Sequence, residues 1–93
     1  MSTPEPAAQY RLDPSARFRV LDGEGIFILQ GAGEVLVVNG VAAFIVERVT
    51  AEVAFDEVVA EVVARYDVQP DQAEADAMTL LENLVEAGAL AAS

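Results

Sequence analysis

The side chains that could do chemistry in this 93-residue chain are of few kinds. The chain has no cysteine, histidine or lysine, and its five basic residues are all arginines. No Ser–His or Cys–His pair can be assembled, and no lysine can form a Schiff base with a substrate. A metal site would need carboxylates alone, and the spacing of a calcium-binding loop does not occur. We therefore expect a protein that is not an enzyme and that uses no metal or cofactor.

The chain is strongly acidic, with sixteen acidic residues and a net charge of −11. Acidity of this kind keeps a small protein in solution, and it can also steer a basic partner toward the surface. A small acidic acyl carrier would need a serine at the start of a helix. The serines are Ser2, Ser15 and Ser93, which lie near the ends of the chain or within the first 15 residues, where no helix is expected. The sequence therefore argues against an acyl carrier.

Composition and length predict one small cytoplasmic domain. Hydrophobic residues make up 54% of the chain, which is too many for a disordered protein. The longest apolar stretch, Val35–Val46, is interrupted by Asn39-Gly40 and falls short of the roughly 18–20 residues of a membrane span. The N-terminus lacks the basic and apolar segments of a signal peptide, and the lack of cysteine fits a reducing compartment. We expect no contact with a membrane.

The first half of the chain is expected to hold a flexible arm over residues 1–15 and then three strands. In residues 17–21 apolar Phe18 and Val20 alternate with arginines, which is typical of a half-buried strand. Glycine-rich turns at 22–25 and 31–33 separate this strand from two more, over residues 26–30 and 34–38. Turns this short join antiparallel neighbours, so the pattern predicts a three-stranded meander.

After residue 38 the apolar period changes from 2 to 3.6 and predicts three helices, over residues 40–49, 54–66 and 70–87. Asn39 suits the N-cap of the first helix, and Pro70 suits the first turn of the third. Gly88 is expected to end the third helix, and Leu90 is expected to fold back onto it. The predicted class is α+β, in the order βββααα, with the domain spanning residues 16–91.

The third strand of this meander is expected to be an edge strand. Its residues Val35–Val38 are all apolar, and only Glu34 at its start carries a charge. Natural edge strands are usually protected by lysine, proline or a bulge. An unprotected apolar edge is either covered within the molecule, paired in a homodimer, or used to bind a partner.

The segments "EVLVVNGVAAFI", "FDEVVAEVVARYDV" and "ADAMTLLENLVEAGAL", in this order and at this spacing, resemble the PqqD-like family. The resemblance covers about residues 17–90. It implies a winged helix-turn-helix-like module that recognises the leader segment of a ribosomally synthesised precursor peptide. The leader would add as a strand beside residues 35–38, with the last helix as the second wall. The peptide-binding residues expected on this basis are Val35, Leu36, Val37, Val38, Ala73, Asp76, Ala77, Leu80, Leu81 and Leu84.

The resemblance also implies a second partner, a modifying enzyme such as a radical-SAM protein, a cyclase or a leader peptidase, in the synthesis of the quinone cofactor PQQ or of another peptide natural product. A winged-helix topology would also suit DNA, but residues 70–87 carry five acidic residues and no basic one. That charge repels phosphate, so we expect no nucleic-acid binding. The alternative to peptide binding is a homodimeric structural or regulatory module whose third strand pairs with itself.

Overall fold

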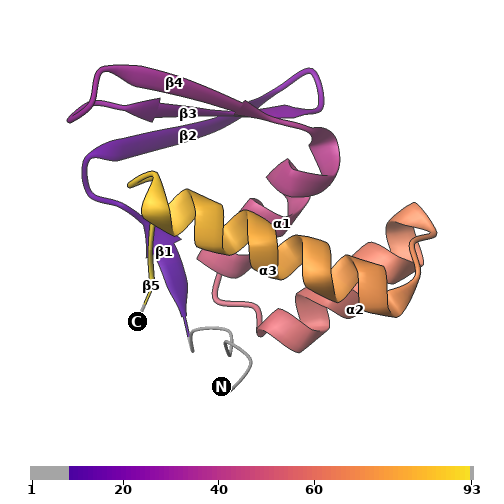
Figure 1. Ribbon diagram of the computed structural model, residues 1–93. Coiled ribbons are helices and arrows are strands. Elements are labelled where there is room, and N and C mark those ends of the chain that lie inside the picture. Colours follow the sequence, from indigo (N-terminus) through magenta and orange to yellow (C-terminus); the bar gives the residue numbers. More distant parts are fainter. Residues whose placement is uncertain (1–8, 93) are drawn as a thin grey trace.

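The structure is a computed structural model, and it describes residues 9–92. A three-stranded sheet lies on one side of the molecule and three helices lie on the other (Figure 1). The elements, in chain order, are β1 (Tyr10–Leu12), β2 (Ala16–Leu21), β3 (Glu24–Leu29), β4 (Glu34–Val38), α1 (Gly40–Thr50), α2 (Phe55–Tyr66), α3 (Pro70–Glu86) and β5 (Leu90–Ala92). The predicted meander and the three helices that follow it are confirmed.

The sheet has the order β2-β3-β4, and both of its hairpins are antiparallel. Asp22 and Gly23 connect β2 to β3 with φ angles of 51° and 80°. Two positive φ angles in a two-residue loop define a type I′ turn, whose twist matches that of the strands. The loop from β3 to β4 spans residues 30–33, and Gly33 supplies its left-handed position with a φ of 67°.

The helices begin and end close to the predicted residues. The side chain of Asn39 accepts a hydrogen bond from the N–H of Ala42 at 2.9 Å, so its predicted role as N-cap of α1 is confirmed. Ala54 occupies the equivalent position of α2 and makes no such bond. Gly88 ends α3 with a φ of 83°, and the N–H groups of Gly88 and Ala89 donate to the carbonyls of Val85 and Leu84. These two bonds form a Schellman motif.

Two short strands were not predicted. β1 lies in the segment that we expected to be an arm, and it pairs antiparallel with β5 at the other end of the chain. Leu90, expected to fold back onto the third helix, is buried and pairs with Leu12 of β1. Strands of three residues are too short to show a period, which is why the sequence pattern missed them. Residues 1–8 of the expected arm lie outside the described residues, and the boundary at residue 16 stays a prediction.

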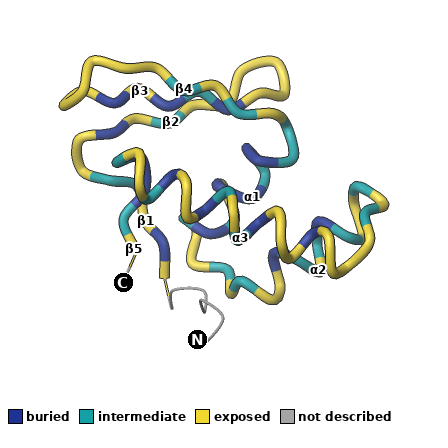
Figure 2. The backbone as a smooth tube through the Cα atoms, viewed as in Figure 1, coloured by how far each residue is buried: buried dark blue, intermediate teal, exposed yellow. Residues whose placement is uncertain are grey.

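One core extends from the inner face of the sheet into the space between the helices (Figure 2). The inner face of the sheet contributes Phe27, which is fully buried and whose ring centroid lies 4.6 Å from that of Phe18. Helices α1 and α2 contribute Val46 and Val58, and α3 contributes Leu81. Within the described residues no polar side chain is buried. The fold is therefore held chiefly by apolar packing.

Candidate functional site

Strand β4 forms one edge of the three-stranded sheet, and within residues 9–92 its other side pairs with no strand. Val35 and Val37 are 62% and 60% exposed. The strand contains no lysine, proline or arginine, and Glu34 at its start is its only charge. The predicted edge is therefore present and is not covered by the described part of the protein.

The register shows which backbone groups of β4 point outward. In a hairpin with a two-residue loop, the pair next to the loop exchanges both hydrogen bonds, and bonded and non-bonded pairs then alternate along the ladder. The pair Leu21–Glu24 closes the first hairpin, so residues 24, 26 and 28 of β3 bond to β2. Residues 25, 27 and 29 are left to bond β4, where their partners are residues 38, 36 and 34. The N–H and C=O groups of Val35 and Val37 consequently point to the open edge.

The side chains of β4 divide between the two faces of the sheet. Leu36 and Val38 are half-buried on the inner face and pack against the core. Val35 and Val37 project from the other face of the sheet, where they pair with Ile28 and Ile26 of β3. A strand added at this edge would therefore meet an apolar surface on both of its sides.

The residues of α3 that we expected in the site fall into two groups. Four of them are buried in the core: Ala73, Ala77, Leu81 and Leu84. Leu80 is half-buried at the margin of the core, and Asp76 is exposed, accepting a hydrogen bond from Gln72 at 2.7 Å. The sequence left open which of Leu80 and Leu81 faces the interior, and it is Leu81. Peptide contact by the ten predicted residues stays a prediction. Of the six that lie on α3, Leu80 and Asp76 are the two that are not buried.

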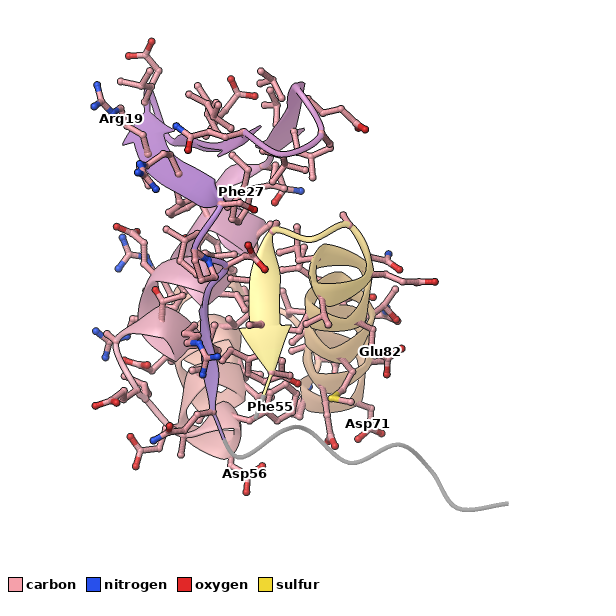
Figure 3. The ribbon with its side chains drawn as sticks, turned by 90° about the vertical axis from the view of Figure 1, so that its left-hand side faces the viewer. Arg19, Phe27, Phe55, Asp56, Asp71 and Glu82 are labelled. Atoms are coloured by element: carbon pink, nitrogen blue, oxygen red, sulfur yellow. The ribbon has the colours of Figure 1, made fainter. Side chains whose placement is uncertain are left out.

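Helix α3 packs against α2, α1 and β5. Its C-terminal end lies toward the end of the sheet where β4 begins (Figure 1). The five acidic residues of α3 are all exposed, and Asp71 and Glu82 point away from the protein (Figure 3). These carboxylates give the helix side of the protein an acidic surface, which repels the phosphates of nucleic acid.

Among the described residues, the side chain of Asp13 has a lowered pKa. The N–H and the hydroxyl of Ser15 donate to Oδ1 of Asp13 at 2.9 and 2.7 Å, and these bonds lower the pKa of Asp13. Asp13 thereby fixes the turn into β2. Residues 9–92 contain no cluster of three potential metal-ligating side chains. In the same range, no helix is long and apolar enough to cross a membrane.

Sequence reasoning missed the apolar residues on the far side of the sheet. Leu21 and Ile28 are 50% and 48% exposed there, and Ile26 is half-buried beside them. A signal was present, because the segment "GIFIL" has apolar residues at consecutive positions instead of an apolar–polar alternation. Such a run predicts a strand that is apolar on both faces.

Solved structures that are similar to this chain include two proteins bound to leader peptides. One is a lasso peptide synthetase B1 complexed with the leader peptide, 27% identical, with a TM-score of 0.84 over 90% of this chain and 99% of that chain. The other is TbiB1 in complex with the TbiA(beta) leader peptide, with a TM-score of 0.79 over 86% of this chain and 93% of that chain. At 19% identity, this second likeness concerns the fold alone.

No curated protein sequence matches the chain. The family model of coenzyme PQQ synthesis protein D (PqqD) matches residues 7–90. The match includes the whole meander, the three helices and the unprotected strand β4. The chain belongs to the PqqD family.

Proposed function

We propose that this protein binds the leader segment of a ribosomally synthesised precursor peptide as an added strand on β4. The observation that carries the proposal is the open edge, at which Val35 and Val37 present backbone groups between two apolar surfaces. Strand addition of this kind uses main-chain hydrogen bonds for affinity and side-chain pockets for selectivity. Membership of the PqqD family and the leader-bound lasso peptide synthetase B1 support it.

The edge can supply enough affinity for this role. Two N–H and two C=O groups form up to four hydrogen bonds, each of roughly 1 kcal/mol net. Two or three buried leader side chains add roughly 1.5–3 kcal/mol each. Ordering a flexible leader costs several kcal/mol. A dissociation constant between about 1 μM and 1 nM follows from these terms.

The protein has no catalytic role of its own in this proposal. It holds the precursor near a modifying enzyme, such as a radical-SAM protein, a cyclase or a leader peptidase, and so raises the effective concentration of the substrate at that enzyme. The absence of histidine, lysine and cysteine from the sequence supports a role in binding alone. We propose that the protein acts in the cytoplasm, where precursor peptides are made.

A pair of proline variants tests the proposed binding mode. Val37→Pro removes an N–H that points to the open edge of β4 and adds a ring that obstructs an incoming strand. We expect leader affinity to fall at least about tenfold, since one lost hydrogen bond and the ring each weaken pairing. The measurement is fluorescence anisotropy with labelled synthetic peptides from the short open reading frames nearest to this chain's gene.

The matched control is Val20→Pro on β2, the opposite edge of the sheet. By the same alternation the N–H of Val20 points away from β3. Val20→Pro should retain the affinity of the unmodified protein, and circular dichroism should show both variants folded. Equal affinity of a folded Val37→Pro variant would contradict the proposal. If sedimentation shows a tight dimer that does not bind the leader, that result would instead favour self-pairing of β4.

A further inference from the structure

The face of the sheet that points away from the helices is exposed to water, yet most of its side chains are apolar. We call it the outer face and define it by eight residues: Arg17, Arg19, Leu21, Glu24, Ile26, Ile28, Val35 and Val37. An antiparallel sheet with one face on the core usually presents polar side chains on the other. Five of these eight residues are apolar, and four of those five are about half exposed or more. Contiguous exposed apolar surface of this kind marks an interaction site.

The register makes the apolar residues of the outer face neighbours. Ile26 pairs with Val37 and Ile28 pairs with Val35 across β3 and β4, while Leu21 lies at the hairpin end of β2. An open depression of about 630 Å³ lies over β2 and β3. It is lined by Arg17, Phe18, Arg19, Leu21, Ile26 and Ile28. The outer face is therefore a continuous surface that is concave on its β2 side.

Two of the five arginines border this depression. Arg17 donates only to the neighbouring carbonyl of Ala16, and Arg19 lies at the outer rim of the sheet (Figure 3). Within the described residues the only ion pair joins Arg48 to Glu61, on α1 and α2. Arg17 and Arg19 therefore have no carboxylate partner, although the chain has sixteen acidic residues. Their position suits a partner that brings carboxylates to an apolar contact.

The outer face is continuous with the edge at which the leader is proposed to bind. Successive side chains of a strand point to opposite faces, so a leader strand on β4 would place alternate side chains beside Val35 and Val37. Those side chains would widen the outer face by one strand. The complete surface would exist only while the leader is bound.

We propose that the outer face is the docking surface for the modifying enzyme, which contributes an apolar segment flanked by carboxylates and prefers the leader-bound protein. The proposal rests on leader binding at β4. A second copy of the chain is a poorer occupant for two reasons. Two molecules of charge −11 repel each other, and neither outer face carries an excess of carboxylates that could pair with the arginines of the other. If the enzyme prefers the leader-bound protein, copies of the protein that carry no precursor will not occupy it.

The test compares two single charge reversals. Arg19→Glu changes the outer face, and Arg65→Glu makes the same charge change on α2, where the guanidinium lies 5.0 Å over the ring of Phe44. The purified enzyme that modifies the precursor is titrated calorimetrically into each variant, with and without saturating synthetic leader. We expect Arg19→Glu to weaken enzyme binding at least fivefold and Arg65→Glu to change it less than twofold.

Leader affinity, measured separately, should stay within twofold in both variants. Unchanged enzyme affinity in Arg19→Glu, or equal enzyme affinity with and without leader, would overturn the docking proposal. Ile28→Thr gives a second measure, because it keeps a β-branched residue while making the outer face polar, and it should also weaken enzyme binding. Failure of the unmodified protein to bind leader would instead overturn the proposed function. A dimer that Ile28→Thr dissociates would assign the outer face to a second copy and contradict the proposal.

Discussion

At Gly25 the inner face of the sheet meets α1 with no room for a side chain. A Cβ built there would lie 2.8 Å from Cε1 of Phe18, 2.8 Å from Cγ2 of Val38 and 3.1 Å from Cβ of Ala43. Val38 belongs to β4, so this close approach helps to hold the edge strand against the core. A glycine that looks like part of a turn in the sequence is thus a packing residue in the fold.

Gly25→Ala should therefore destabilise the protein by about 1–3 kcal/mol, the usual cost of forcing extra volume into a packed site. Urea unfolding followed by circular dichroism measures this loss. Gly31→Ala is the matched control, because the nearest atom to its added Cβ is Oγ of Ser15 at 3.9 Å. Equal stability of the two variants would contradict this account of Gly25.

At the start of α2, a single substitution should stabilise the protein. Ala54 has the extended backbone of an N-cap, with φ −61° and ψ 144°, but no side-chain acceptor. Ala54→Ser should supply an acceptor for a free N–H of the first turn and stabilise the protein by about 0.5–2 kcal/mol. Thermal unfolding measures the gain, and Ala60→Ser, at an exposed position inside the same helix, should give none. A gain at position 60 instead would contradict the capping argument.

At the scale of elements, the sequence predicts what depends on a local period and misses what depends on distant pairing. Val58 and Val62 repeat at helical spacing and mark α2, and the alternation around Phe18 marks β2. The pairing of β1 with β5 joins residues about 80 positions apart in strands of three residues, so no local pattern reveals it. Which backbone groups of β4 point outward depends on the register and on the type I′ turn, and these are visible only in the structure.

The pairing of β1 with β5 should contribute measurably to the free energy of unfolding. Leu90 in β5 is 1% exposed, and Leu90→Ala should cost about 2–5 kcal/mol through lost burial and the cavity that remains. Leu21→Ala makes the same change at a residue that is 50% exposed and should cost well under half as much. Urea unfolding of both variants checks the difference. Similar losses would mean that β5 is not part of the cooperative core.

At the scale of the whole molecule, the acidic surface of α3 and the exposed apolar surface of the sheet lie on different sides (Figure 1). The exposed acidic residues of α3 lie on the helix side, whereas the unpaired Arg17 and Arg19 lie on the outer face of the sheet. The apolar edge of β4 adjoins that outer face. The sequence predicted the strand and its lack of protection. It could not show that four of the six predicted residues of α3 are core residues, because periodicity marks the apolar face of a helix without telling what covers it.

The central claim is that the backbone groups of Val35 and Val37 receive the leader, and amide hydrogen exchange read residue by residue by NMR tests it most directly. In the free protein, the amides of Val35 and Val37 should exchange fast and those of Leu36 and Val38 slowly, since the latter bond to β3. Adding the leader should slow exchange at Val35 and Val37 and leave Val20 on the opposite edge fast. Slow exchange at Val35 and Val37 before leader is added, or no slowing after saturation, would contradict the account.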